Sequence, residues 1–235
     1  MNDMKTIPLF KVHIPDSVDM PLLDVLHSGY IGQGVKVDKF EDALAERIGN
    51  KNIVTLNTGT AGLRLALHII GMRKDSEVIT TPMTCLATNT PIVESGAKIV
   101  WADINRSTGN IDPKSIEERI TDRTRAIMCV HWGGYSCDLD EIHEIATKND
   151  IPVIEDAAHA FGAEYKNRKI GTISDFTVFS FQAIKHITTG DGGFLACKFE
   201  ETYKRAKLLR WYGLNRDYSK DLRCEQDVKE AGFKY

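Results

Sequence analysis

The chain has 235 residues, of which 42% are hydrophobic and 27% are charged, and its formal net charge is −3 at pH 7. This composition is ordinary for a globular protein of one or two domains. No basic tract, long acidic block or run of about 18 apolar residues occurs. We therefore expect neither a nucleic-acid partner nor a membrane span.

The cysteines and the N-terminus bear on the cellular compartment. The five cysteines, at positions 85, 129, 137, 197 and 224, do not show the paired spacing that binds a metal. They are typical of reduced thiols in a cytosolic protein. The first residues contain no apolar run fit for a signal peptide. We expect a cytoplasmic protein without a metal site.

Apolar runs that predict strands alternate with segments of helical periodicity. The predicted strands cover residues 52–56, 77–80, 98–102, 125–131, 152–155, 175–180 and 193–197. Apolar residues recur at helical spacing within 40–48, 63–70 and 142–146, and a further helix is expected over 201–210. This alternation predicts an α/β fold with a mostly parallel sheet. The last two strands follow one another closely, so part of the sheet is expected to be antiparallel.

The segment Thr58-Gly59-Thr60-Ala61-Gly62 follows a predicted strand and opens a predicted helix. Backbone N–H groups at a helix N-terminus point at bound anions, and small residues let a phosphate come close. Thr58 could equally be an ordinary helix N-cap. The segment alone leaves phosphate binding and capping both open.

Asp156 ends a predicted strand in the run Glu155-Asp156-Ala157-Ala158-His159. Ligands of open α/β sheets collect at the carboxyl ends of strands. A carboxylate beside a pyridine nitrogen keeps that nitrogen protonated, so that the ring can act as an electron sink. The alternative is an aspartate that only caps the following turn.

Lys185 ends the run 179–185, FSFQAIK, and the glycines Gly190, Gly192 and Gly193 follow it. A lysine amine loses its proton when it is desolvated, and it can then bond to an aldehyde. A solvated surface lysine is the alternative, but the glycines indicate a special backbone here. With Asp156 upstream and the Ser180 hydroxyl inside the same run, these are the parts of a pyridoxal phosphate (PLP) site.

In these motifs the chain resembles the DegT/DnrJ/StrS family of sugar-nucleotide aminotransferases, which have the three-layer PLP-dependent transferase fold of type I. The resemblance implies that Lys185 forms a Schiff base with PLP and that Asp156 faces the ring nitrogen. It implies that Thr60, Ala61 and Ser180 hold the cofactor phosphate. Ala158 would pack on one ring face. His159 would lie near the Schiff base, unless it is a structural histidine.

Cys85 departs from the family pattern. In the run 82–88, PMTCLAT, it stands where the family usually has an aromatic residue that stacks on the cofactor. We expect the thiol to lie on the ring face opposite Ala158, with a weaker contact than an aromatic ring would make. The alternative is a small buried hydrophobe. Lys185 itself disfavours the sugar dehydratase branch, which has histidine at this position.

The resemblance implies an activity and a layout. The activity is transfer of an amino group from an amino acid, glutamate, to a nucleotide-linked 4-keto-6-deoxy sugar, by a homodimer. Residues 1–235 would be the PLP-binding large domain with an N-terminal arm, and the family's smaller C-terminal domain is expected to be absent. A truncated PLP-binding protein with a non-catalytic or regulatory role is the main alternative. Trp132, in the run 131–134 (HWGG), is attributed to packing and left outside the site.

Overall fold

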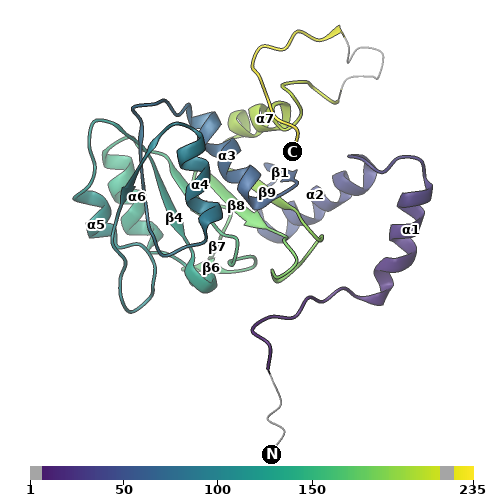
Figure 1. The fold of residues 1–235 in the computed structure, drawn as a ribbon, viewed down its shortest axis with the longest axis horizontal. Coiled ribbons are helices and arrows are strands. Elements are labelled where there is room, and N and C mark those ends of the chain that lie inside the picture. Colours follow the sequence, from purple (N-terminus) through teal and green to yellow (C-terminus); the bar gives the residue numbers. More distant parts are fainter. Residues whose placement is uncertain (1–6, 218–224) are drawn as a thin grey trace, which may run out of the picture.

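A seven-stranded sheet forms the centre of the computed structural model, which describes residues 7–217 and 225–235 (Figure 1). Its order is β1-β9-β8-β5-β4-β2-β3. The strands are β1 Ile53–Leu56, β2 Glu77–Thr80, β3 Lys98–Trp101, β4 Thr124–Val130, β5 Val153–Asp156, β8 Phe176–Ser180 and β9 Gly193–Cys197. A small hairpin of β6 Glu164–Tyr165 and β7 Arg168–Lys169 lies apart from this sheet.

Neighbouring strands run parallel except at β9, which is antiparallel to both β1 and β8. The expected strands are therefore confirmed, with boundaries that shift by at most one residue, and so is the antiparallel part of the sheet. Because most of the strands are apolar and buried on both sides, with the edge strand β3 as the more exposed exception, the sheet needs a layer of helices on each face.

The helices that cover the sheet form two layers. They are α2 Val35–Ile48, α3 Gly59–Ile70, α4 Leu86–Glu94, α5 Pro113–Glu117, α6 Leu139–Lys148 and α7 Glu200–Leu209. Residues of α2, α5 and α6 belong to one apolar core cluster, and residues of α3, α4 and α7 belong to another. Strand β4 feeds both clusters: Ile127 and Cys129 face the first, whereas Ala126 and Met128 face the second. The expected three-layer α/β fold is confirmed.

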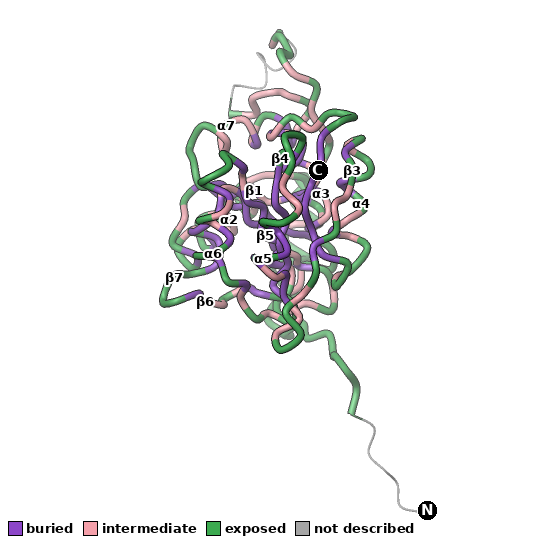
Figure 2. The backbone as a smooth tube through the Cα atoms, turned by 90° about the vertical axis from the view of Figure 1, so that its left-hand side faces the viewer, coloured by how far each residue is buried: buried purple, intermediate pink, exposed green. Residues whose placement is uncertain are grey.

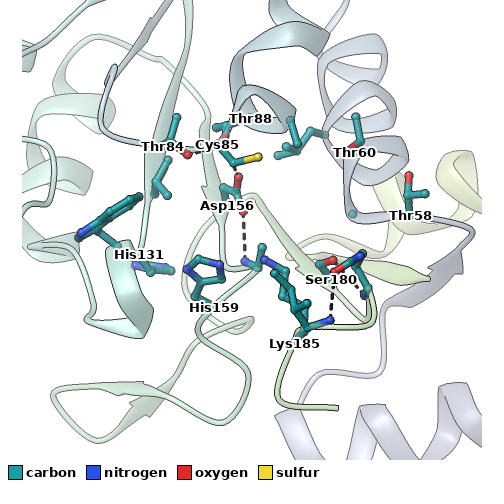
Figure 3. A pocket seen from close by; sticks show the side chains of 18 of the residues that line it. Thr58, Thr60, Thr84, Cys85, Thr88, His131, Asp156, His159, Ser180 and Lys185 are labelled. Carbon is teal, nitrogen blue, oxygen red and sulfur yellow. Dashed lines mark hydrogen bonds between the residues drawn. The ribbon is translucent and has the colours of Figure 1, made fainter. Parts of the chain in front are cut away.

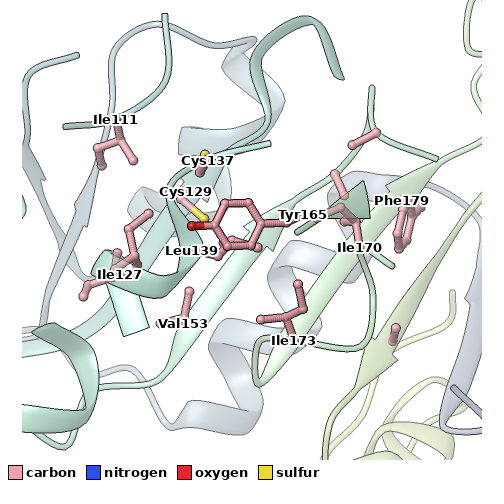
Figure 4. Close-up of a cluster of buried hydrophobic side chains, with 14 of the residues drawn as sticks. Ile111, Ile127, Cys129, Cys137, Leu139, Val153, Tyr165, Ile170, Ile173 and Phe179 are labelled. Atoms are coloured by element: carbon pink, nitrogen blue, oxygen red, sulfur yellow. The ribbon is translucent and has the colours of Figure 1, made fainter. Parts of the chain in front are cut away.

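The first cluster extends from the sheet to the β6–β7 hairpin. Tyr165 of the hairpin is only 9% exposed and lies among Leu139, Cys129 and Ile173 (Figure 4). The burial of this ring attaches the hairpin to the body of the protein, since aromatic rings remove large apolar areas from water.

Two of the covering helices, α4 and α5, were not predicted. Helix α4 contains Pro91 and carries little amphipathic pattern, so periodicity could not reveal it. Helix α5 begins with Pro113 after the N-cap Asp112, whose side chain accepts the Lys114 N–H. That capping signal is readable in the sequence. Helix α4 matters for function because it carries Thr88.

The N-terminal arm, residues 7–31, stands away from the body (Figures 1 and 2). It contains the short helix η1 Asp16–Val18 and helix α1 Asp19–His27, neither of which has a buried residue. Large apolar side chains of the arm are exposed, among them Leu9, Met20 and Ile31. Across residues 7–217 and 225–235, no helix combines the length and apolar character needed to cross a membrane.

Candidate active site

A cavity of about 380 Å³ lies where β4, β5 and β8 end and where α3 and α4 begin (Figure 3). Its size is that of a small-molecule site. Seven of the expected site residues line it: Thr60, Cys85, Asp156, Ala158, His159, Ser180 and Lys185. Ala61 is buried and does not belong to the lining. The fold thus brings together residues that are up to 125 positions apart, from Thr60 to Lys185.

One end of the cavity is formed by the first turn of α3. Thr58 is the N-cap of this helix, and its Oγ1 accepts the Ala61 N–H at 3.0 Å. The capping alternative is therefore confirmed, and the Ala61 amide that a phosphate would use is shared with Thr58. The Gly59 and Thr60 amides belong to the same turn, in which N–H groups have no preceding helical carbonyl to bond. Capping and anion binding are compatible here.

Two glycines bring Ser180 to this helix start. A Cβ on Gly59 would lie 3.1 Å from the Ser180 Cβ and 3.3 Å from the Phe179 carbonyl oxygen. A Cβ on Gly193 would lie 2.7 Å from the Gly59 nitrogen. Larger residues would push α3 away from the ends of β8 and β9. The Ser180 hydroxyl and the positive end of the α3 dipole therefore face the same part of the cavity.

Asp156 forms the opposite end, where it is 6% exposed. Its Oδ1 accepts the Ala158 N–H at 3.1 Å, so Asp156 also caps the turn after β5. Its Oδ2 accepts the Thr88 hydroxyl at 2.6 Å. The hydroxyl oxygens of Thr84 and Thr88 are 2.6 Å apart. Sequence reasoning missed Thr84 and Thr88, because the helix that carries Thr88 was not predicted.

A fully buried pair, His131 and Glu155, adjoins the cavity, and His131 is one of the residues that line it. The His131 Nε2 and a Glu155 carboxylate oxygen are 2.7 Å apart. Because the Cys137 N–H donates to His131 Nδ1, the ring proton is on Nε2 and is donated to Glu155. Burial raises the pKa of Glu155, but hydrogen bonds from His131, Ser174 and Thr177 outweigh this and hold it below its usual value.

His131 and the residue after Glu155 also join the ends of the two strands through their backbones. The His131 backbone N–H donates to the Asp156 carbonyl at 3.1 Å, so β4 and β5 stay paired up to the edge of the cavity. The sequence analysis did not single out Glu155 as a functional residue. Its partner lies 24 residues away and is brought close only by the parallel pairing of the two strands.

Lys185 lies on the turn after β8, where its N–H donates to the Gln182 carbonyl at 2.8 Å. Desolvation lowers the pKa of the Lys185 amine, whereas the charges of Asp156 and Cys85 partly oppose this. Partial enclosure lowers the pKa of His159, and the positive charge of Lys185 lowers it further. Lys185 is therefore half-enclosed and is not an ordinary solvated surface lysine.

Cys85 and Trp132 complete the walls. Cys85 is exposed to the cavity, so the alternative of a buried small hydrophobe is wrong. Trp132, which the sequence analysis attributed to packing, lines the cavity and is 36% exposed. Its backbone N–H donates to Asn110 Oδ1 at 2.9 Å. The position of Trp132 just after β4 was the available signal, because ligands collect at strand ends.

The set of groups in the cavity suits PLP. A helix start with a serine hydroxyl can hold a phosphate, a buried carboxylate can face a ring nitrogen, and an amine with a lowered pKa can meet an aldehyde. Among the residues that the structure describes, no cluster of three metal-ligating side chains occurs.

Comparisons with known proteins agree with this chemistry. A profile of the DegT/DnrJ/EryC1/StrS aminotransferase family matches residues 16–235. The chain is 40% identical over 223 residues to a UDP-4-amino-4,6-dideoxy-N-acetyl-beta-L-altrosamine transaminase of Campylobacter jejuni, covering 94% of this chain and 57% of that protein. It spans only about three fifths of the length of such relatives.

Solved structures show the same likeness. The sugar aminotransferase CalS13 from Micromonospora echinospora superposes with a TM-score of 0.91 at 38% identity, covering 97% of this chain and 64% of CalS13. Spr1654 from Streptococcus pneumoniae, solved in a PLP form, superposes with a TM-score of 0.89 at 31% identity, covering 98% of this chain and 62% of Spr1654.

Proposed function

Because the chain belongs to the DegT/DnrJ/EryC1/StrS aminotransferase family, we propose that it binds PLP and transfers an amino group to a nucleotide-linked keto sugar. We further propose glutamate as the donor and a 4-keto-6-deoxy sugar as the acceptor. One observation carries the proposal: Lys185, Asp156 and Ser180 line one cavity with the start of α3. These are the groups that an amine, a ring nitrogen and a phosphate require.

The cofactor's place follows from the two ends of the cavity. When bound, PLP supplies an aldehyde that takes up an amine and a protonated ring that withdraws electrons from the reacting carbon. The first turn of α3, with Thr60 and Ser180, holds the phosphate. The Ala61 N–H, which also donates to the Oγ1 of the N-cap Thr58, adds to this contact. Asp156 faces the ring nitrogen at the other end.

The ring lies between two small side chains. Cys85 and Ala158 both line the cavity, and we assign them to opposite faces of the ring. Their small size leaves room for a planar group, but it offers less stacking area than an aromatic residue. His159, beside Lys185, is assigned to the phenolic oxygen.

Lys185 carries the catalytic step in this proposal. Its Nζ would be the amine that meets the cofactor's aldehyde, and as a free amine it would carry a proton to or from the reacting carbon. A neutral amine is needed for both roles, and desolvation lowers the pKa of Lys185 in the required direction. Positioned proton transfer contributes about 10²- to 10⁴-fold to a rate.

We also propose that the protein is a homodimer in the cytoplasm. The arm supports the dimer because its exposed apolar side chains form a surface that monomeric proteins rarely leave in water. The free thiols of Cys85, Cys129, Cys137 and Cys197 suit a reducing compartment. Sedimentation at micromolar concentration should give a dimer, and the pair Leu22→Glu and Leu26→Glu should give a monomer. A monomeric parent would contradict the dimer.

Half-transamination tests the proposed function. Purified protein mixed with PLP should develop visible absorption, and added glutamate should bleach it while 2-oxoglutarate forms. Borohydride before glutamate should fix the cofactor covalently at residue 185, as read by peptide mass spectrometry. Cofactor binding without bleaching would favour the non-catalytic alternative, and no cofactor binding at all would refute the proposal.

A further inference from the structure

Thr88 occupies a buried position between Thr84 and the Asp156 carboxylate. It is 1% exposed and lies in the first turn of α4. Its hydroxyl oxygen is 2.6 Å from Asp156 Oδ2 and 2.6 Å from the Thr84 hydroxyl oxygen. Asp156 lies 68 residues further along the chain, so this contact exists only in the folded protein.

The directions of these hydrogen bonds follow from the number of protons. An ionised carboxylate only accepts hydrogen bonds, so Thr88 donates its single hydroxyl proton to Asp156. Thr84 must then donate its own proton to the Thr88 oxygen. The result is a directed chain, Thr84 to Thr88 to Asp156, in which each bond polarises the next.

This chain of hydrogen bonds holds the Asp156 carboxylate, which has other partners within reach. Asp156 Oδ1 is held by the Ala158 N–H, and Oδ2 is held by Thr88, so two separate elements clamp the two oxygens. Lys185 and His159 both lie within electrostatic range of Asp156. Without the hydroxyl of Thr88, the positive charge of Lys185 would compete for the carboxylate.

We propose that Thr88 is a positioning residue that keeps the Asp156 carboxylate directed at the cofactor's ring nitrogen, with Thr84 as its donor. This inference rests on the proposed function, since it needs bound PLP. With Thr88 in place, the carboxylate would stay where it can accept a hydrogen bond from the protonated ring nitrogen. A carboxylate that turned away would leave that proton without its acceptor.

Thr88→Val tests the inference because valine keeps the shape and removes the hydroxyl. Two quantities should be measured: the PLP dissociation constant, and the ¹⁵N chemical shift of ring-labelled PLP, which reports protonation of that nitrogen. Thr88→Val should weaken PLP binding about tenfold or more, as expected for a lost hydrogen bond to a charged group. It should also move the ¹⁵N shift toward the unprotonated value. Thr88→Ser keeps the hydroxyl and should resemble the parent.

Thr80→Val is the matched control. Thr80 is also fully buried at the end of a strand, and its hydroxyl donates to Asn89 Oδ1 of the same helix α4. Like Thr88, it donates a buried hydroxyl hydrogen bond that ties a strand to α4, but its acceptor is Asn89 and not Asp156. Thr80→Val should leave both the dissociation constant and the ¹⁵N shift at the parent values.

The outcomes separate the inference from the proposed function. If the parent binds PLP and Thr88→Val matches it in both measurements, the inference is overturned and the function stands. If Thr88→Ser loses as much as Thr88→Val, the hydroxyl is not the cause and the inference is likewise overturned. A parent that does not bind PLP overturns both. Should Thr88→Val fail to fold, Thr84→Val decides: a shift in the ¹⁵N signal supports the chain, and an unchanged signal overturns it.

Discussion

In the proposed PLP site, the residues assigned to the ring nitrogen and those assigned to the aldehyde are held in different ways. The acid end, Asp156 with Thr88, Glu155 and His131, is buried, and its polar groups are paired at 2.6–3.1 Å. The lysine end is the turn of residues 181–192, a half-exposed loop closed at its base by the bond from the Phe181 N–H to the Gly192 carbonyl.

This difference matches what each end must do. Asp156 would face the same ring nitrogen throughout the reaction, so its carboxylate can be held rigidly by Ala158 and Thr88. Lys185 must bond to the cofactor, release it and move a proton, so its side chain has to change position. Gly190, with a φ of 85°, and Gly192, with a φ of 156°, give the turn a backbone that other residues rarely adopt.

Removing the Lys185 amine should have the largest effect. Lys185→Ala should abolish borohydride-fixed cofactor and lower the rate of glutamate half-transamination by several powers of ten, because both bonding to the aldehyde and proton transfer are lost. Non-covalent PLP binding should survive through the phosphate contacts and Asp156. Lys169→Ala, on β7 and outside the cavity lining, is the control. A variant with near-normal turnover and a covalent adduct would refute Lys185 as the catalytic residue.

Neutralising the acid end should come next. Asp156→Asn keeps the size of the side chain and removes the charge that holds the ring proton. We expect the half-transamination rate to fall about a hundredfold, as for the loss of one preorganised electrostatic partner. Stopped-flow absorption measures this rate. An unchanged rate would mean that Asp156 does not face the ring nitrogen.

Loss of the Glu155 charge, next to Asp156, should lower the stability of the protein. Glu155→Gln removes the charge from a carboxylate with three hydrogen-bond donors, so the free energy of unfolding should fall by about 2 kcal/mol at pH 7. Urea unfolding measures this. Glu117→Gln, at an exposed ion pair with Lys148, should change stability little.

The same variant predicts a pH dependence. The folded-state pKa of Glu155 lies below the unfolded value of 4.5, so its contribution is present above pH 4.5 and is lost as the pH falls further. The parent should therefore lose more stability than Glu155→Gln between neutral and strongly acidic pH. Parallel curves for the two proteins would show that folding does not lower the pKa of Glu155.

The smallest effect should come from replacing Cys85, the residue assigned to one face of the cofactor ring. Cys85→Trp supplies the aromatic residue that this family usually has there, and stacking adds about 1 kcal/mol, or roughly fivefold tighter PLP binding. Equilibrium dialysis can detect this change. Cys85→Ser is the control for loss of the thiol alone. Equal retention by all three proteins would place residue 85 away from the ring.

The sequence by itself determined the sheet and most of the cavity lining. Strands such as β2 and β9 were predicted with their observed ends, because strands buried on both faces are short apolar runs bounded by turn signals. Asp156, Ser180 and Lys185 were found because their motifs end or follow such strands, and strand ends meet at one edge of a sheet.

Only the tertiary structure decided what surrounds these residues. Thr88 reaches Asp156 through a helix with too little amphipathic pattern to predict, and Glu155 meets His131 only through the register of β4 with β5. That Trp132 lines the cavity is likewise visible only in the folded structure. A periodic pattern reports which face of an element is buried, but a hydrogen bond between distant residues depends on how two elements pack. That information is present only in the folded chain.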